Sequence, residues 1–195
     1  DAALAGINAL SSKLSAARKK AAAPLSAEIT GMLHRLGMPH ARFEVAISPL
    51  PSPGPSGTDD IGFLFSANRQ VEPEDLSKCA SGGELSRVML CLKSVLANSS
   101  GLPAIIFDEI DSGVSGEVAS MVGSILSEMG KSMQVINITH LPQVAAQGHQ
   151  HLFVHKVRDS EATRTAVSKL SQKERVEEVA RMLGGIDLTT ESLAH

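Results

Sequence analysis

The stretch "AIIFDEID", residues 104–111, decides the fold, because four apolar residues run directly into acidic ones. A short continuous apolar run is typical of a parallel strand that is covered on both faces. A second run of this kind, "QVINITH" at residues 134–140, follows after a helical stretch. The order strand, helix, strand with short connections predicts a right-handed parallel unit. This half of the chain is therefore predicted to be α/β.

Polar side chains follow both predicted strands. Asp108 and Glu109 end the first strand with Asp111 just beyond, and His140 ends the second. Ligand and metal chemistry in open α/β sheets collects at the carboxyl ends of strands, where one carboxylate can bind Mg²⁺ and the next can orient an attacking water. At the same edge, His140 could reach a terminal phosphate. The alternatives are a solvated acidic turn and a hydrogen-bonded structural histidine, and the residues alone leave both open.

The stretch "CASGGELSR", residues 79–87, precedes a strongly apolar run that predicts a helix from about Gly83 to Asn98. A Ser-Gly-Gly sequence at a helix start exposes backbone N–H groups and a hydroxyl group, which is one way in which proteins bind phosphate. Ser81 is also a good N-cap on its own, and glycine is tolerated there. The tetrapeptide Ser81-Gly82-Gly83-Glu84 is therefore either a phosphate site or a plain helix start.

Two helices and a hairpin are predicted before this stretch. Residues 1–23 are Ala-rich, with an apolar stripe at Leu4, Ile7, Leu14 and Ala21 that indicates the end of a coiled-coil arm or an isolated amphipathic helix. Pro24 is expected to break this helix, and a second one is expected to stop at Gly37. Alternation at residues 43–47 and 61–65 predicts two antiparallel strands joined by a surface loop over residues 49–60.

After the acidic strand, the pattern predicts a helix over residues 115–130, a short helix at 141–147 and edge strands at 151–157 and 164–170. The last helix begins at Ser171, with Glu174 three residues on as a capping box, and stops at Gly184-Gly185.

Composition excludes several classes of protein. The net charge of −3 gives no global attraction to nucleic acid or membrane. The two cysteines, Cys79 and Cys91, have no CxxC spacing, which fits a reducing cytosol. No apolar run reaches transmembrane length and no secretory signal is visible. The chain opens in mid-helix without Met, so we expect it to be a fragment.

Two weaker candidates have ordinary alternatives. His149, His151 and His155 alternate as metal ligands on one strand face would, but no Cys or carboxylate stands at ligand spacing beside them. The basic run at residues 18–20 could contact DNA phosphates, although solvated helix charges give the same pattern.

A nucleotide-hydrolysing domain normally carries a GxxxxGK[ST] loop that cradles phosphate. The Gly130-Lys131-Ser132 triplet is not such a loop, because its upstream Gly123 stands two residues too far away and the triplet follows a helix. The phosphate-binding loop is missing from this sequence.

Three motifs together carry a family resemblance. "ASGGELSR", "IIFDEIDSGVSGEVA" and "VINITHLPQVAA" resemble, in order and spacing, the signature motif, the Walker B motif with its D-loop, and the switch-histidine region of ABC-type ATPases. The residues of these motifs are most similar to the C-terminal head lobe of the SMC-like members that act in bacterial DNA repair. The resemblance covers most of residues 60–185. It departs at "NRQVEPED", where a Pro-Gly turn is expected after Asn68.

The resemblance implies roles for the signature. Ser81, Gly82, Gly83 and Glu84 would contact the terminal phosphate of an ATP bound on an opposing head.

It also implies roles at the strand ends. Asp108 would bind Mg²⁺, Glu109 would be the general base, Asp111 would lie in the D-loop and His140 would sense the terminal phosphate.

We therefore expect an α/β fold: the C-terminal lobe of an ABC/SMC-type P-loop ATPase head, with a parallel sheet core, an antiparallel hairpin and a coiled-coil stub. Residues 1–23 would end the arm and residues 24–195 would form the lobe. The resemblance implies an ATPase with ATP and Mg²⁺ as cofactors, active in double-strand-break repair and recombination in the bacterial cytoplasm at the nucleoid. Its partners would be an N-terminal Walker A lobe of the same protein, a second head, and DNA, but no membrane. The alternatives are a structural SMC-like dimerisation module that does not hydrolyse ATP, and a fragment of a transporter ATPase.

Overall fold

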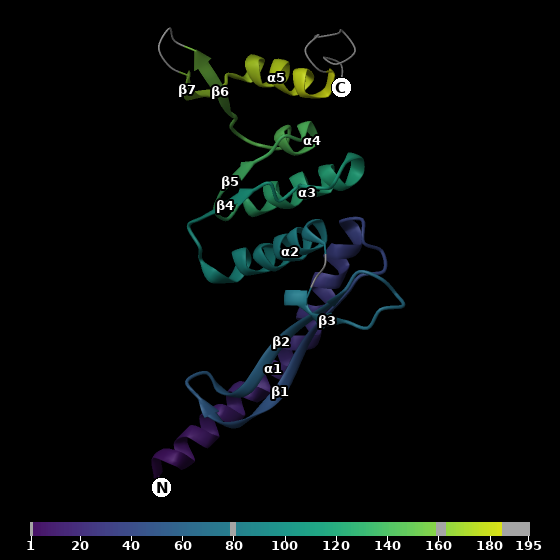
Figure 1. Cartoon of the computed structure of the whole chain (residues 1–195). Coiled ribbons are helices and arrows are strands. Elements are labelled where there is room, and N and C mark those ends of the chain that lie inside the picture. The colour runs from purple at the N-terminus through teal and green to yellow at the C-terminus, as the bar shows by residue number, and fades with distance from the viewer. Residues whose placement is uncertain (1, 79–80, 159–162, 185–195) are drawn as a thin grey trace. The chain divides into compact units, whose positions relative to one another are not determined.

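The computed structural model describes residues 2–78, 81–158 and 163–184, and the chain forms two compact units, Asp1–Lys93 and Ser94–His195 (Figure 1). The first unit is built on a long helix and a hairpin. The second is built on a parallel strand pair with its helices, followed by an antiparallel hairpin and a last helix.

Helix α1 runs from Ala2 to Arg35 without interruption, so the predicted break at Pro24 is wrong. A proline removes one backbone hydrogen bond, and tertiary contacts can compensate for that loss. Here the hairpin holds the helix on both sides of the proline. Arg18 pairs with Asp59 at 3.0 Å, and the Ser26 hydroxyl oxygen accepts a hydrogen bond from the Val45 backbone N–H at 3.1 Å.

The predicted stop after α1 is confirmed. Gly37 has φ 77°, a left-handed conformation that glycine adopts without a Cβ clash, and its N–H donates to the carbonyl oxygen of His34. The side chains of Ile29, Leu33 and Leu36 are fully buried.

The predicted hairpin is confirmed as β1 (Arg42–Gly54) and β2 (Gly57–Ser66), which pair antiparallel with Phe43 opposite Phe65. Figure 1 shows this hairpin lying along α1. The loop expected over residues 49–60 is wrong for most of its length, because both strands extend into it. β1 is an edge strand, where prolines are tolerated, and a register shift between Pro49 and Gly54 accommodates them.

A short strand, β3 (Glu74–Asp75), pairs with β2, and a 3₁₀ turn, η1, covers Leu76–Lys78. Helix α2 then runs from Gly82 to Ser100, close to the predicted range.

The predicted β–α–β unit is present in the second half. β4 (Ala104–Asp108) and β5 (Gln134–Ile138) pair in parallel, with Ala104 beside Gln134 and Asp108 beside Ile138. Helix α3 (Gly116–Met129) connects them and buries Val122, Ile125, Leu126 and Met129. The Lys131-Ser132 turn joins α3 to β5, as expected for a connection and not for a phosphate loop.

The expectation that both faces of this strand pair are covered is wrong for the described residues. Ile106, Ile136 and Ile138 are 65%, 40% and 53% exposed, whereas Phe107 on the opposite face is buried. One face therefore packs and the other is a bare apolar surface.

Helix α4 (Pro142–Ala145) follows β5, and the strands β6 (Leu152–Arg158) and β7 (Thr163–Lys169) form an antiparallel hairpin. Helix α5 (Gln172–Gly184) begins with the predicted capping box: the Ser171 N–H donates to Glu174 Oε2 at 2.8 Å, and the Glu174 N–H donates to Ser171 Oγ at 3.4 Å. Gly185 lies outside the described residues. Among the described helices, none is both long enough and apolar enough to cross a membrane.

Candidate functional site

The carboxyl edge of the parallel pair gathers the polar residues that follow β4 and β5. Asp108 is the last residue of β4, and the next residue, Glu109, donates its backbone N–H to the carbonyl oxygen of Ile138 at 3.2 Å. His140 follows Ile138 by two residues. Asp108, Glu109 and His140 are all exposed, so this edge offers two carboxylates and an imidazole to solvent.

Glu109 has a strained backbone. Its φ is 51°, the single positive φ of a non-glycine residue in the part of the chain that the structure describes. A conformation of this kind costs on the order of 1–3 kcal/mol, persists only where the surroundings hold it, and clusters at active sites. The strain falls on the residue whose type and place suit a general base.

Asp111 lies two residues further on, yet it is fully buried. Its Oδ2 accepts a hydrogen bond from the Thr139 hydroxyl group, and its Oδ1 has no partner among the described residues. The same hydroxyl oxygen accepts a hydrogen bond from the Leu141 backbone N–H at 3.0 Å. Asp111 therefore faces the protein interior in this chain, and direct contact with a nucleotide stays a prediction.

Sequence reasoning missed Thr139. A threonine just before the Leu-Pro start of a helix signals a local cap, but only the fold reveals its second partner, 28 residues away.

The described residues hold no group of three or more His, Cys, Asp or Glu side chains arranged to bind a metal ion. Asp108 offers the oxygen ligand that Mg²⁺ prefers, and Mg²⁺ commonly takes one or two carboxylates together with substrate phosphates. Two of the three histidines considered as metal ligands make contacts of their own. His151 Nε2 lies 2.5 Å from the carbonyl oxygen of Ala145, and the His155 ring stacks on Phe153 at 5.2 Å.

The signature residues lie in the first unit, at the start of α2. The Leu85 N–H donates to the Ser81 carbonyl oxygen at 3.0 Å, so Ser81 is the N-cap residue. Ser81 and Gly82 are exposed, and Gly83 and Glu84 are half-buried. A Cβ at Gly82 would meet nothing within 4 Å, and Gly82 has no positive φ. The described fold therefore does not itself require a glycine there.

Arg87, also missed from the sequence, ties this helix start to the turn that follows α1. Its guanidinium group donates to the carbonyl oxygens of Gly83, at 3.1 Å, and Leu36, at 3.2 Å. The i, i+4 spacing of Gly83 and Arg87 could have predicted the first of these contacts. Nothing in the sequence pattern indicated the contact with Leu36.

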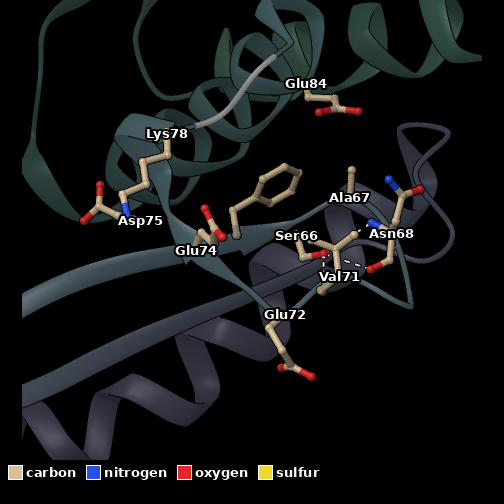
Figure 2. Close-up of a pocket in the computed structure, with 10 residues that line it drawn as sticks. Ser66, Ala67, Asn68, Val71, Glu72, Glu74, Asp75, Lys78 and Glu84 are labelled. Carbon is tan, nitrogen blue, oxygen red and sulfur yellow. Dashed lines mark hydrogen bonds between the residues drawn. The ribbon is translucent and has the colours of Figure 1, made fainter.

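A cavity of about 190 Å³ lies beside the end of β2 (Figure 2). The Ser66 hydroxyl group donates to the carbonyl oxygens of Asn68, at 2.8 Å, and Val71, at 2.7 Å, which shapes one wall. The charged lining residues are Glu72, Glu74, Asp75, Glu84 and Lys78. A lining with more acidic than basic groups repels phosphate, so this cavity does not suit the phosphates of a nucleotide.

Comparison with known proteins gives a consistent family. The chain is 41% identical over 184 residues to DNA repair protein RecN of Xylella fastidiosa (strain 9a5c), covering 93% of this chain and 33% of that protein. It is 44% identical over 172 residues to RecN of Deinococcus radiodurans, covering 88% and 30%. The chain thus spans about a third of the length of these relatives. No protein-family model matches the sequence.

Solved structures give the fold. The Smc head domain with a coiled coil and joint from Pyrococcus yayanosii aligns with a TM-score of 0.61 at 18% identity, over 80% of this chain and 28% of that one. A structure of SMC ATPases, described as dimerising under ATP and activated by DNA, aligns with a TM-score of 0.57 at 18% identity, over 84% and 93%. With its RecN relatives and its SMC-type head fold, the chain belongs to the RecN family.

Proposed function

We propose that this chain is half of an ATP-hydrolysing SMC-like head, which engages a second head through ATP and acts at the nucleoid in DNA double-strand-break repair and recombination. The observation that carries the proposal is the strained, exposed Glu109 at the same strand edge as Asp108 and His140. The RecN relatives are DNA repair proteins, and an SMC relative in fold is described as an ATP-driven dimer.

The proposed roles follow from side-chain chemistry. Glu109 accepts a proton from the attacking water, since its carboxylate is exposed and makes no hydrogen bond or ion pair with the described residues. His140 donates a hydrogen bond to the terminal phosphate of the nucleotide. Asp108 holds Mg²⁺, which when bound neutralises charge on the phosphates.

The half-head proposal explains the bare sheet face. Ile106, Ile136 and Ile138 expose apolar surface that a Walker A lobe of the same protein would cover. Complete burial of a fully exposed isoleucine stabilises by about 1.5–3 kcal/mol, and the exposed parts of these three side chains together give a docking surface worth a fraction of that for each. The relatives are about three times as long as this chain, which leaves room for such a lobe.

The signature is proposed to act across the dimer. The exposed Ser81 N-cap and the unencumbered Gly82 leave the first N–H groups of α2 open to a phosphate. Ser81, Gly82, Gly83 and Glu84 would contact the nucleotide of the opposing head. Asp111 would lie in the D-loop. The proposed division of the chain is that residues 1–23 end the coiled-coil arm and residues 24–195 form the lobe.

The test is Glu109→Gln in the complete protein, with ATP turnover and ATP-dependent dimerisation as readouts. The variant keeps the side-chain size but cannot take a proton, so we expect turnover to fall by about 10²–10⁴-fold while ATP still binds and dimers accumulate. Glu128→Gln is the matched control, because Glu128 is an exposed residue of α3 whose ion pair among the described residues is with nearby Lys131.

A Glu109→Gln protein that hydrolyses ATP at the parental rate would remove Glu109 from the mechanism. A parental protein that dimerises but never hydrolyses ATP would favour the structural dimerisation module instead. A flanking membrane span in place of a coiled coil would favour the transporter ATPase.

A further inference from the structure

The turns that follow β4 and β5 are joined by two contacts. One is the backbone hydrogen bond from Glu109 N–H to the Ile138 carbonyl oxygen, at 3.2 Å. The other is the side-chain hydrogen bond from Thr139 to the buried carboxylate of Asp111. Both contacts lie next to residues proposed for catalysis, because Glu109 itself makes the first and His140 directly follows Thr139, which makes the second.

The Thr139 hydroxyl group both donates and accepts a hydrogen bond. It donates to Asp111 Oδ2, and its oxygen accepts the Leu141 N–H at 3.0 Å. Leu141 is the N-cap residue of α4, and its carbonyl oxygen accepts the N–H groups of Val144 and Ala145, at 3.1 and 2.9 Å. The Thr139 hydroxyl oxygen therefore connects the turn after β4 to the start of α4. Because it joins Thr139 to Leu141, it also fixes the backbone of His140 between them.

The turn after β4 needs such a tie. Glu109 has its strained φ of 51°, and a strained residue stays in place only where surrounding contacts hold it. Ser112 N–H donates to the Glu109 carbonyl oxygen at 3.1 Å, which closes the turn locally. Asp111 anchors that turn from inside the protein, and Thr139 is its side-chain partner among the described residues.

We propose that Thr139 is a positioning residue, whose hydroxyl group holds Glu109 and His140 in the relative places that ATP hydrolysis requires. The inference rests on the function proposed above. Thr139 itself touches no reacting atom: it acts through Asp111 on the Glu109 turn and through Leu141 on the His140 segment. A displacement of about 1 Å in a catalytic group can cost about 10²-fold in rate, so loss of the tie affects turnover more than nucleotide affinity.

The experiment uses the complete protein with Thr139→Val, which keeps the branched shape but lacks the hydroxyl group, and Thr139→Ser, which keeps the hydroxyl group. Ser132→Ala is the control, because it removes a hydroxyl group bound to the Met129 carbonyl oxygen, at 3.1 Å, at the opposite end of β5. Turnover is expressed per nucleotide-binding site, so that unfolded molecules do not count. Hydrogen exchange is followed in peptides that cover residues 108–114 and 138–146, without nucleotide.

We expect Thr139→Val to lower kcat by about 10- to 100-fold with KM for ATP nearly unchanged, and to speed exchange in both peptides together. Thr139→Ser and Ser132→Ala should keep a kcat close to that of the parent, because both leave the Thr139 position with a hydroxyl group. A Thr139→Val protein that unfolds at a lower temperature but keeps its kcat per site, or a loss that serine does not rescue, would overturn the positioning role.

Failure of the proposed function is separate from failure of this inference. If the parental protein does not hydrolyse ATP, the proposed function fails by itself. Hydrogen exchange then still tests the link through Thr139. Faster exchange in both peptides of Thr139→Val supports the link, and unchanged exchange rejects it.

Discussion

The carboxylate of Asp59, in β2, accepts a hydrogen bond from the Ser15 hydroxyl group of α1 at 2.7 Å, although 44 residues separate the two in the chain. Arg18 adds an ion pair to the same carboxylate at 3.0 Å. These contacts fasten the outer half of the hairpin to the long helix, on the N-terminal side of Pro24.

The first prediction concerns the pH dependence of this link. The hydrogen bond from Ser15, and then that from Arg18, lower the pKa of Asp59 below its usual 3.8. A carboxyl group with a lowered folded pKa contributes stability that is present above the unfolded pKa and is lost as pH falls through the folded one. Asp59→Asn should therefore lower the unfolding temperature at pH 7, and its difference from the parent should shrink below pH 3.8.

Thermal unfolding of both proteins at pH 7 and at pH 3 measures this. Asp60→Asn is the control, since it changes the neighbouring exposed carboxylate of the same strand. Equal differences at both pH values would contradict a role for the Asp59 charge.

The second prediction separates a phosphate-binding helix start from a plain cap at Ser81. If Ser81 only caps α2, Ser81→Arg costs roughly 0.5–2 kcal/mol of stability and leaves turnover intact. If it meets the nucleotide of a facing head, the bulky side chain blocks closure. We expect near-normal ATP binding by the complete protein, loss of ATP-dependent dimerisation and at least about a 10²-fold loss of turnover.

Mixing Ser81→Arg with a variant in the phosphate-binding loop gives the sharper measurement. One composite site then carries both lesions and the other carries none, so part of the activity should return. Ser124→Arg, at an exposed position of α3, controls for added bulk and charge. A mixture of folded, exchanging subunits that recovers no activity argues against contact across the dimer.

The third prediction tests the bare sheet face. Ile138→Lys places a charge on a side chain that is 53% exposed in this chain. In the isolated chain the cost in stability should be small, whereas in the complete protein it should be about 2 kcal/mol or more, because the docked lobe would bury the lysine. Denaturant unfolding of both lengths compares the two costs. Ile61→Lys, on the hairpin and 41% exposed, is the control, and equal costs for Ile138→Lys in both lengths would leave the face without a partner.

The fourth prediction concerns Cys91, which is fully buried in α2. Burial raises the pKa of its thiol from 9.0 to about 12. The folded protein should therefore resist alkylation at Cys91 at pH 8 until it is unfolded, as peptide mass spectrometry can measure. Because the unfolded thiol loses its proton first, this group contributes stability below pH 9 that is lost between pH 9 and about 12. A Cys91→Ala variant should lack that part of the pH dependence, and rapid labelling of Cys91 in the folded protein would contradict its burial.

Much of the fold could be read from local patterns. The alternation at Phe43 and Phe65, the stop at Gly37 and the capping box at Ser171 depend on neighbours in the chain, and the structure contains all three. The shared edge of Asp108 and His140 followed from strand order alone, because parallel strands end on the same side. The roles of these residues remain proposals.

Long-range contacts explain the errors. Pro24 should end a helix by its own chemistry, but the hairpin holds α1 on both sides of it. The apolar run around Ile106 indicated a strand covered on both faces. Among the described residues only the face that carries Phe107 is covered, because the apolar pattern of a strand does not say whether another element packs on each of its faces.

The sequence by itself determined the order of the elements, most of their ends and the edge where the polar side chains gather, because hydrogen bonds and side-chain periodicity within a few residues set these features. Only the tertiary structure decided that α1 passes Pro24, that Glu109 takes a left-handed backbone and that Thr139 binds Asp111. Each of these depends on residues far apart in the chain that meet only after folding, and the free energy of those contacts outweighs the local preference of the proline or the glutamate.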